Sequence, residues 1–253
     1  MAYTSTSTST SIPKFVLFDV DGVIVENKAI HNKISQNVAK YVKHVSPKKL
    51  SHMEANELTK ILYKTYGHTL RGIHATINKT HTHTIKDFCD FVYDNESISH
   101  LYEEISSLDF KNSDTIFNFK KFIYRCADSN IKVYLFSNAP MKWCLPLIDE
   151  LQLRDIIPYN QIFSCNSGFN KDGLLKPDNL LYYRIEQNLL KNNPGQIYFI
   201  DDSVVNLVPV MNNLNWTPIL YQPEDVIYKS AWMNSISSLD QLNEIVFNDV
   251  YIQ

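Results

Sequence analysis

The sequence predicts an α/β protein, in which a doubly wound parallel sheet carries an inserted all-helical domain. Three short runs have the length and the β-branched or aromatic content of buried parallel strands, at residues 15–18, 131–136 and 197–200. Amphipathic stretches with helical spacing lie between and after these runs. Strands that alternate with helices are typical of such a sheet, which binds its ligands beyond the carboxyl ends of its strands.

The other elements of the sheet region follow from local patterns. A weaker fourth strand is expected over 218–221, and a helix over 113–129 begins with a serine cap. A helix over 177–190 has proline in its first turn. Ser238 and Gln241 form a capping box before the last helix. The residues that these three helices are expected to bury are Ile116, Phe119, Ile123 and Cys126; Leu180, Leu181 and Ile185; and Leu242, Ile245 and Val246.

An inserted helical domain is expected over 26–109, between the first two strands. A parallel crossover needs about a dozen residues and a helix, and this segment is far longer. All eight histidines of the chain fall in it. We therefore expect a helical cap between two parts of an α/β core, 12–25 and 110–253. Apolar residues recur at helical spacing in three stretches, Ile30, Ile34, Val38, Val42 and Val45; Leu58, Ile61 and Leu62; and Phe88, Phe91 and Val92.

The composition is that of a globular protein, with 44% hydrophobic and 20% charged residues. A net charge of −3 gives no basic surface for nucleic acid polymers, and no apolar run approaches the ~18 residues that cross a membrane. Four widely spaced cysteines favour free thiols in a reducing compartment. Residues 1–11 form a Ser/Thr tract unlike a secretory signal, so we expect a disordered tail and a cytoplasmic protein. Nothing in the sequence indicates the oligomeric state.

Polar residues follow the ends of the three predicted strands. Several carboxylates in a partly dry cleft repel one another, and a magnesium ion, which prefers oxygen ligands, relieves that repulsion. A hydroxyl, an amide and an ammonium group together can hold a phosphate. The residues expected at this edge are Asp19 and Asp21 after the first strand, Ser137 and Asn138 after the second, Asp201 and Asp202 after the third, and Lys176 before the 177–190 helix.

These motifs, in this order, resemble those of the haloacid dehalogenase-like (HAD) hydrolase superfamily. The likeness covers nearly the whole chain after the tail, from the D-x-D-G motif of Asp19, Asp21 and Gly22 to the paired acidic motif. The resemblance implies a Rossmann-like core, a Mg²⁺ cofactor and a small-molecule phosphomonoester substrate. The Ser-Asn motif and the lysine would bind the phosphate.

The same resemblance implies an aspartyl-phosphate mechanism. Asp19 would be the nucleophile, and Asp21 would be first the general acid and then the general base. Magnesium would be held by the Asp19 carboxylate, the Asp21 main-chain carbonyl and Asp202, with Asp201 acting through water. Dehalogenating members lack an aspartate two places after the nucleophile, so Asp21 is typical of a phosphatase or phosphomutase.

Residues 63–77 and 88–96 are similar to the cap of the pyrimidine 5′-nucleotidase-like branch, in which Y-G-x-T-L-R-G is a recurring segment. This similarity implies a nucleoside 5′-monophosphate substrate. It also makes Arg71 a candidate substrate residue, because its guanidinium suits an anionic ligand. The first motif departs from that branch, which usually has D-x-D-N-T-L-Y where this chain has Asp21-Gly22-Val23-Ile24. The departure bears on the substrate and leaves the reaction unchanged.

Two other functions share these motifs. A sugar-phosphate phosphatase or phosphomutase needs every core residue, and a catalytically inactive binding protein could use the same scaffold. The intact set of aspartates and lysine argues against the inactive protein. Simple structural roles also compete with functional ones: a helix cap for Ser137 and Asn138, a solvated lysine for Lys176, a surface ion pair for Arg71, a polar loop for His81 and His83, and packing for Trp143 and Trp216.

Overall fold

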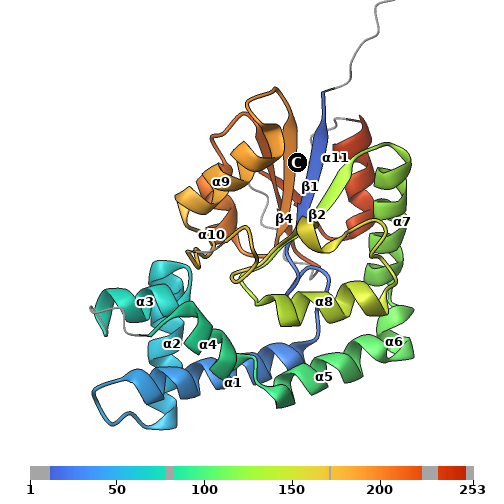
Figure 1. The fold of residues 1–253 in the computed structure, drawn as a ribbon. Helices are drawn as coiled ribbons and strands as arrows, with labels where there is room; N and C mark the ends of the chain where they lie inside the picture. Colours follow the sequence, from blue (N-terminus) through green and yellow to red (C-terminus); the bar gives the residue numbers. More distant parts are fainter. Residues whose placement is uncertain (1–11, 78–82, 171, 224–232, 249–253) are drawn as a thin grey trace, which may run out of the picture.

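A six-stranded parallel sheet forms the centre of the protein, with helices on both of its faces (Figure 1). The computed structural model describes residues 12–77, 83–170, 172–223 and 233–248, so the expected tail lies outside the described residues. The predicted fold class, a Rossmann-like doubly wound sheet, is confirmed. In the sheet order β3-β2-β1-β4-β5-β6, the strands are β1 (Lys14–Phe18), β2 (Lys132–Phe136), β3 (Ile162–Phe163), β4 (Gln196–Asp201), β5 (Trp216–Tyr221) and β6 (Asn234–Ile236).

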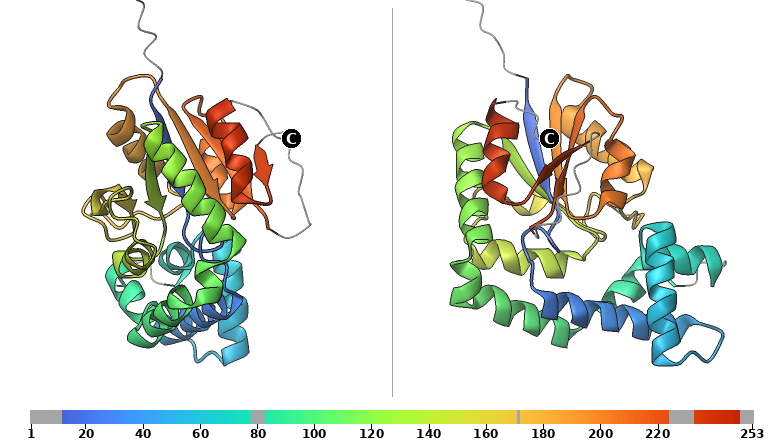
Figure 2. Two further views of the ribbon diagram at one scale, coloured as in Figure 1. Left: turned by 90° about the vertical axis from the view of Figure 1, so that its right-hand side faces the viewer. Right: turned by 180° about the vertical axis from the view of Figure 1, so that it is seen from behind.

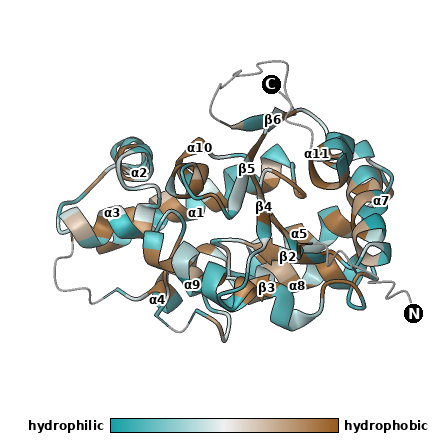
Figure 3. Cartoon of the chain, turned by 90° about the horizontal axis from the view of Figure 1, so that it is seen from above, coloured by the Kyte–Doolittle hydropathy of each residue, from teal (hydrophilic) through white to brown (hydrophobic). Residues whose placement is uncertain are grey.

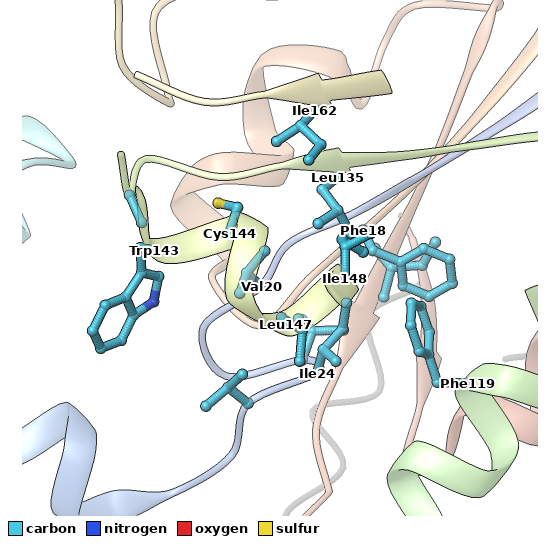
Figure 4. Packing of buried hydrophobic residues seen from close by; sticks show 14 of the residues in the cluster. Phe18, Val20, Ile24, Phe119, Leu135, Trp143, Cys144, Leu147, Ile148 and Ile162 are labelled. Atoms are coloured by element: carbon cyan, nitrogen blue, oxygen red, sulfur yellow. The ribbon is translucent and has the colours of Figure 1, made fainter. Parts of the chain in front are cut away.

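Each face of the sheet has its own apolar cluster, because successive side chains of a strand point to opposite faces. Val16 and Phe18 of β1 pack with α7 (Asp114–Asp128), α8 (Met141–Glu150) and α11 (Leu242–Asn248), as part of this cluster shows in Figure 4. Phe15 and Leu17 pack on the other face with α9 (Asn179–Leu190) and α10 (Val204–Leu207). Figure 2 shows α7 and α11 on one side of the sheet and α9 on the other.

Five helices form a layer beyond the carboxyl ends of the strands (Figure 1). We call α1 to α5 the helical layer. Within it, α1 contacts α2, α4 and α5, and α2 contacts α3. Complete capping boxes at Ser51 and Thr84 start α2 and α4. The helices are α1 (Lys28–Val45), α2 (His52–Tyr66), α3 (Thr69–Thr76), α4 (Ile85–Val92) and α5 (Asn95–Ser106), followed by the short α6 (Leu108–Lys111). Short 3₁₀ turns lie at Tyr159–Gln161, Val208–Val210 and Leu239–Gln241.

Several local predictions are confirmed. Ser113 accepts a hydrogen bond from the Ile116 amide at 3.3 Å and so caps α7. The capping box of Ser238 and Gln241 precedes α11, whose Leu242 is buried. All four cysteines are free and buried. Around the outer helices, hydrophobic and hydrophilic residues lie on different faces (Figure 3), and among the described residues no helix is long and apolar enough to cross a membrane.

Three expectations of burial and one helix start are wrong. The helix expected from Pro177 begins at Asn179, because the Asp178 side chain accepts from the Leu180 amide and caps it there. Leu180 is 45% exposed. Leu181 and Ile185 face the sheet, and Leu180, one position before Leu181, therefore points away from it. Ile61, at 59%, and Phe91, at 38%, are also exposed, because each is adjacent to a residue that faces inward, Leu62 on α2 and Val92 on α4.

Candidate active site

The strand register brings the predicted polar residues to one edge of the sheet. Phe18 of β1 pairs with Leu135 of β2 on one side and with Ile200 of β4 on the other. Asp19, Phe136 and Asp201, the next residue of each strand, are therefore at the same level. The Asp19 amide continues the ladder by donating to the Ile200 carbonyl at 2.9 Å. Asp19 and Asp201 thus lie side by side at the carboxyl end of the sheet, and Ser137 follows directly after the end of β2.

Lys176 is a buried cation between two of these carboxylates. Its Nζ lies 2.9 Å from Asp19 Oδ2 and 2.6 Å from Asp201 Oδ2, and the residue is 1% exposed. Burial alone would lower the pKa of Lys176, but Asp19 and Asp201 raise it above its ordinary value. The ammonium therefore stays charged. A solvated surface lysine, the simpler interpretation of Lys176, does not fit this burial.

Asn138 holds the main chain of that lysine in place. Its Oδ1 accepts from the Lys176 amide at 2.7 Å, and its Nδ2 donates to the Lys176 carbonyl at 3.1 Å. Ser137 Oγ accepts from the Ala139 amide at 3.0 Å. Both residues line the cavity described below, and the Asn138 amide also fixes the segment that carries the cation.

Asp201 is fully buried, and both of its oxygens accept hydrogen bonds. Oδ1 accepts from the Ser203 amide at 2.8 Å and from Asn206 Nδ2 at 3.0 Å, while Oδ2 accepts from Lys176. Asp202 is different, because its side chain is exposed toward the cavity although protein atoms surround it. Desolvation, followed by the charge of Asp201, raises the pKa of Asp202 to about 7.

The three carboxylates of Asp19, Asp201 and Asp202 can hold a cation. Each offers an oxygen, and these oxygens lie within 4.8 Å of one another. Burial raises the pKa of Asp19 well above its ordinary value, and Asp201, Asp202 and Asp21 raise it further, although Lys176 opposes them. A single ammonium does not offset this many carboxylates. An all-oxygen set with excess negative charge fits Mg²⁺.

Gly22 allows Asp202 to come close to the first motif. Its φ is +85°, a left-handed conformation that favours glycine. A Cβ at this position would lie 2.2 Å from Asp202 Oδ2, and that distance is sterically impossible. The glycine of the D-x-D-G motif is therefore favoured by the turn, and any other residue would also have to displace the Asp202 carboxylate.

Asp21 follows β1 by three residues and is anchored by a tryptophan. The indole Nε1 of Trp143, on α8, donates to Asp21 Oδ1 at 2.9 Å. Burial raises the pKa of Asp21, whereas the hydrogen bond from Trp143 and the nearby His31 lower it. Trp143 is fully buried, as expected of a packing residue, but it also binds a polar group of the site.

A cavity of about 790 Å³ lies between the sheet edge and the helical layer. The sheet side contributes Asp19, Asp21, Ser137, Asn138, Ala139, Lys176, Asp202 and Asn206. The helical layer and the turns between its helices contribute the opposite wall: His31, Ile34, Ser35, Val38, Met53, Asn56, Glu57, Thr59, Lys60, Tyr63, His68, Thr69, Phe88 and Tyr93. Six of the eight predicted site residues therefore line one cavity, and Asp201 lies beneath it, bonded to Lys176.

Arg71 is, besides Asp201, the other predicted site residue that does not line this cavity. It lies on α3, and its Nη1 is buried without a hydrogen-bond partner among the described residues. Its charge is close enough to His68 to lower the pKa of that imidazole. Arg71 is thus behind the cavity wall. Of the loop histidines, His81 falls outside the described residues, and the His83 carbonyl lies 2.6 Å from His74 Nε2.

The wall formed by α2 was not predicted from the sequence. Met53, Asn56, Glu57, Lys60 and Tyr63 recur every three or four residues and line the cavity together. This spacing places the five residues on one face of the helix, but every helix face repeats in this way, so the spacing alone could not mark a cavity wall. Trp143 carried no signal either, since its partner is far away in the sequence.

Comparison with known proteins agrees with this geometry. Residues 13–209 match the family described as haloacid dehalogenase-like hydrolase. The chain belongs to this hydrolase family. No curated protein matches the chain.

Solved structures share the fold at low sequence identity. A HAD phosphatase from Thermococcus onnurineus has 17% identity and a TM-score of 0.54, covering 92% of this chain and 98% of that chain. CbbY from Rhodobacter sphaeroides, in complex with phosphate, has 15% identity and a TM-score of 0.56, covering 91% and 96%. L-2-haloacid dehalogenase from Xanthobacter autotrophicus, with chloropropionic acid covalently bound, has 12% identity and a TM-score of 0.53, covering 93% and 98%. The HAD fold thus includes both phosphatases and dehalogenases.

Proposed function

We propose that this HAD hydrolase is a Mg²⁺-dependent phosphomonoesterase that works through an aspartyl-phosphate intermediate. The observation that carries the proposal is Asp21, a second carboxylate beside the buried Asp19, facing the same cavity. A departing halide needs no proton, whereas a departing alkoxide does. A general acid beside the nucleophile therefore favours a phosphate ester over a haloacid.

The two aspartates divide the reaction between them. A carboxylate oxygen of Asp19 forms the bond to phosphorus while the bond from phosphorus to the leaving oxygen breaks, and Asp21 gives that oxygen its proton. Asp21 then takes a proton from water as the water attacks phosphorus, which releases phosphate and restores Asp19. Lys176 stays protonated throughout and offsets negative charge beside Asp19.

The residues that would hold Mg²⁺ are the Asp19 carboxylate, the Asp21 main-chain carbonyl and Asp202. When bound, the ion offsets the charge of the phosphoryl group. Asp201 is proposed to act through water, because its oxygens already accept from Lys176, Ser203 and Asn206. Ser137, Asn138 and Lys176 are proposed to bind the phosphate, with Asn138 also fixing the lysine.

The proposed substrate is a nucleoside 5′-monophosphate, with a pyrimidine base preferred. The described part of the proposed cap, 26–109, forms the wall that faces the leaving group. That wall carries the aromatic rings of Tyr63, Phe88 and Tyr93, which suit stacking on a base. Arg71 is proposed to reach the substrate from α3, where its buried Nη1 lacks a partner among the described residues. A sugar-phosphate phosphatase or phosphomutase is the alternative, because the sheet side would serve either substrate.

A phosphate-release screen tests the function. Purified protein is given nucleoside monophosphates, hexose phosphates and an aryl phosphate, with Mg²⁺ or with a chelator. We expect release that requires Mg²⁺, is greatest for UMP and CMP, and falls by at least about 10³-fold in Asp19→Asn. Preference for hexose phosphates would contradict the nucleotidase assignment alone. Absence of turnover on every ester, or near-normal turnover by Asp19→Asn, would contradict the phosphatase mechanism and favour the inactive binding protein or a different nucleophile.

A further inference from the structure

Trp143 connects the polar site to the helical layer. Its Nε1 donates to Asp21 Oδ1 at 2.9 Å, and its ring contacts the Tyr93 ring at 5.2 Å between centroids, with 63° between the planes. Tyr93 caps α4 and lines the cavity, so this residue belongs to the wall that faces the sheet. The indole therefore lies between a carboxylate of the core and an aromatic residue of the helical layer.

The position of the indole is determined by the core. Trp143 is in the first turn of α8, which begins at Met141, separated from the Ser137-Asn138 segment by Ala139 and Pro140. Its neighbours Cys144, Leu147 and Ile148 pack toward Phe18 and Leu135, while the indole lies to one side of that cluster (Figure 4). A fully buried ring on a packed helix has little freedom to turn, so its N–H direction is constant.

An indole N–H can donate but cannot accept, and this limits what Asp21 can do with each oxygen. Oδ1 must remain an acceptor while it faces Trp143. The other oxygen, Oδ2, is then the one that can exchange a proton with a leaving group or a water. We propose that Trp143 is a positioning residue for the general acid–base step, and that it orients Asp21 so that Oδ2 faces the substrate. This proposal rests on the phosphatase function proposed above.

The competing explanation is that the contact with Asp21 only satisfies the buried indole N–H of Trp143 and has no role in catalysis. The chain contains a matched control for that explanation. Trp216 is also buried, and its Nε1 donates to Glu186 Oε2 at 2.7 Å, away from the cavity. Trp216→Phe thus removes the same indole hydrogen bond to a carboxylate and leaves the site unchanged.

The first measurement compares leaving groups. In Trp143→Phe, we expect kcat for an alkyl phosphate to fall about tenfold more than kcat for an aryl phosphate, because misplacing a reacting group can cost ~10²-fold and an aryl leaving group needs little acid. KM should change little for either ester. Trp216→Phe should lower thermal stability comparably and leave the ratio of the two kcat values unchanged. Equal losses on both esters in Trp143→Phe, or the same ratio change in both variants, would overturn the proposal.

The second measurement does not depend on activity. The chain has three tryptophans, and the indole ¹⁵N–¹H signals of Trp143 and Trp216 are assigned by their absence in the two phenylalanine variants. In Asp21→Ala, the Trp143 signal should shift and exchange faster with water, while the Trp216 signal stays in place. An unchanged Trp143 signal would show that Trp143 does not donate to Asp21 in solution, and the proposal would be rejected. Wild-type protein without turnover on any ester would instead contradict the phosphatase function, and the role of Trp143 would be rejected with it.

Discussion

Two parts of the cavity lining, the sheet edge with its lysine and the outer face of α2, differ in how firmly their polar side chains are held. On the sheet side, Asp201 and Lys176 are buried, and partners from several elements bind them. On α2, Lys60 pairs with its near neighbour Glu57 on the same helix and with no other acidic group of the described residues, and both side chains are more than half exposed. Tyr63, next along that face, is 46% exposed.

This difference matches what each wall has to recognise. A phosphoryl group and its metal are the same in every phosphomonoester, so rigid and fully paired groups can be arranged for them once. The leaving groups differ in size and polarity, and side chains with free ends can adapt to them. We therefore expect substitutions on the sheet side to affect all substrates alike, and substitutions in the helical layer to affect them unequally.

The largest effect is expected at Lys176. Lys176→Met keeps the length of the side chain and leaves Asp19 and Asp201 without their cation. Breaking a buried ion pair in this way destabilises a protein by about 3–5 kcal/mol, and turnover of every ester should be lost. Urea unfolding and phosphate release measure the two effects. Lys142→Met is the control, because its ammonium lies 3.8 Å from Asp90 at the surface and such pairs contribute about 0–1 kcal/mol. Similar unfolding free energies for the two variants would contradict the expected contribution of the buried ion pair to stability.

The next effect, at Asp21, depends on the leaving group. Asp21→Asn should lower kcat for an alkyl phosphate by about 10²–10⁴-fold, which is the usual contribution of general acid–base catalysis. The loss should be smaller for an aryl phosphate, whose leaving oxygen needs no proton. Steady-state rates on the two esters measure the difference. If both esters lose activity to the same extent, Asp21 is not the acid.

Substitution of Arg71 tests the helical wall. Arg71→Ala should lower kcat/KM for UMP or CMP by about tenfold, as expected for one lost hydrogen bond of a charged group, and should affect a small aryl phosphate far less. Arg125→Ala is the control, because that guanidinium donates to Asn243 and lies over the Phe247 ring, outside the cavity. An equal loss of kcat/KM on all substrates would show that Arg71 stabilises α3 and does not contact the substrate.

The smallest effect on turnover is expected at His68, whose titration instead contributes to the pH dependence of stability. Burial, followed by the nearby Arg71 and His74, lowers the pKa of His68 to about 3, and its Nδ1 accepts from the Leu70 amide at 3.1 Å. The unfolded chain binds this proton below about pH 6.5 and the folded chain does not, so stability falls as pH decreases from about 6.5 toward 3. The slope from this group is at most about 1.4 kcal/mol per pH unit.

The control for His68 keeps its role at the start of α3. His68→Asn retains a side-chain acceptor at the N-cap position and removes the titrating group. The unfolding free energy of the wild type minus that of the variant should therefore decrease as pH falls from 6.5 to 4.5. A difference that is constant with pH would show that the imidazole is protonated normally in the folded protein.

The parts of the fold that could be predicted have a strong local signal. The runs that became β1, β2 and β4 are continuous and apolar, as strands buried on both faces must be. The two-residue β3 and the three-residue β6 were missed, because segments this short have no periodicity to detect. Leu180 was assigned to the core because an apolar side chain next to Leu181 fits the pattern, although only one of two adjacent helical positions can face the sheet.

The sequence by itself determined which chemical groups meet at the sheet edge, because parallel strands end at the same side and Asp19, Ser137 and Asp201 each follow one of them. Only the tertiary structure decided which groups bind one another. The pairing of Lys176 with Asp201 and of Trp143 with Asp21 joins segments that lie far apart in the chain. Such contacts depend on how helices pack against the sheet and against one another, and no local spacing records the result of that packing.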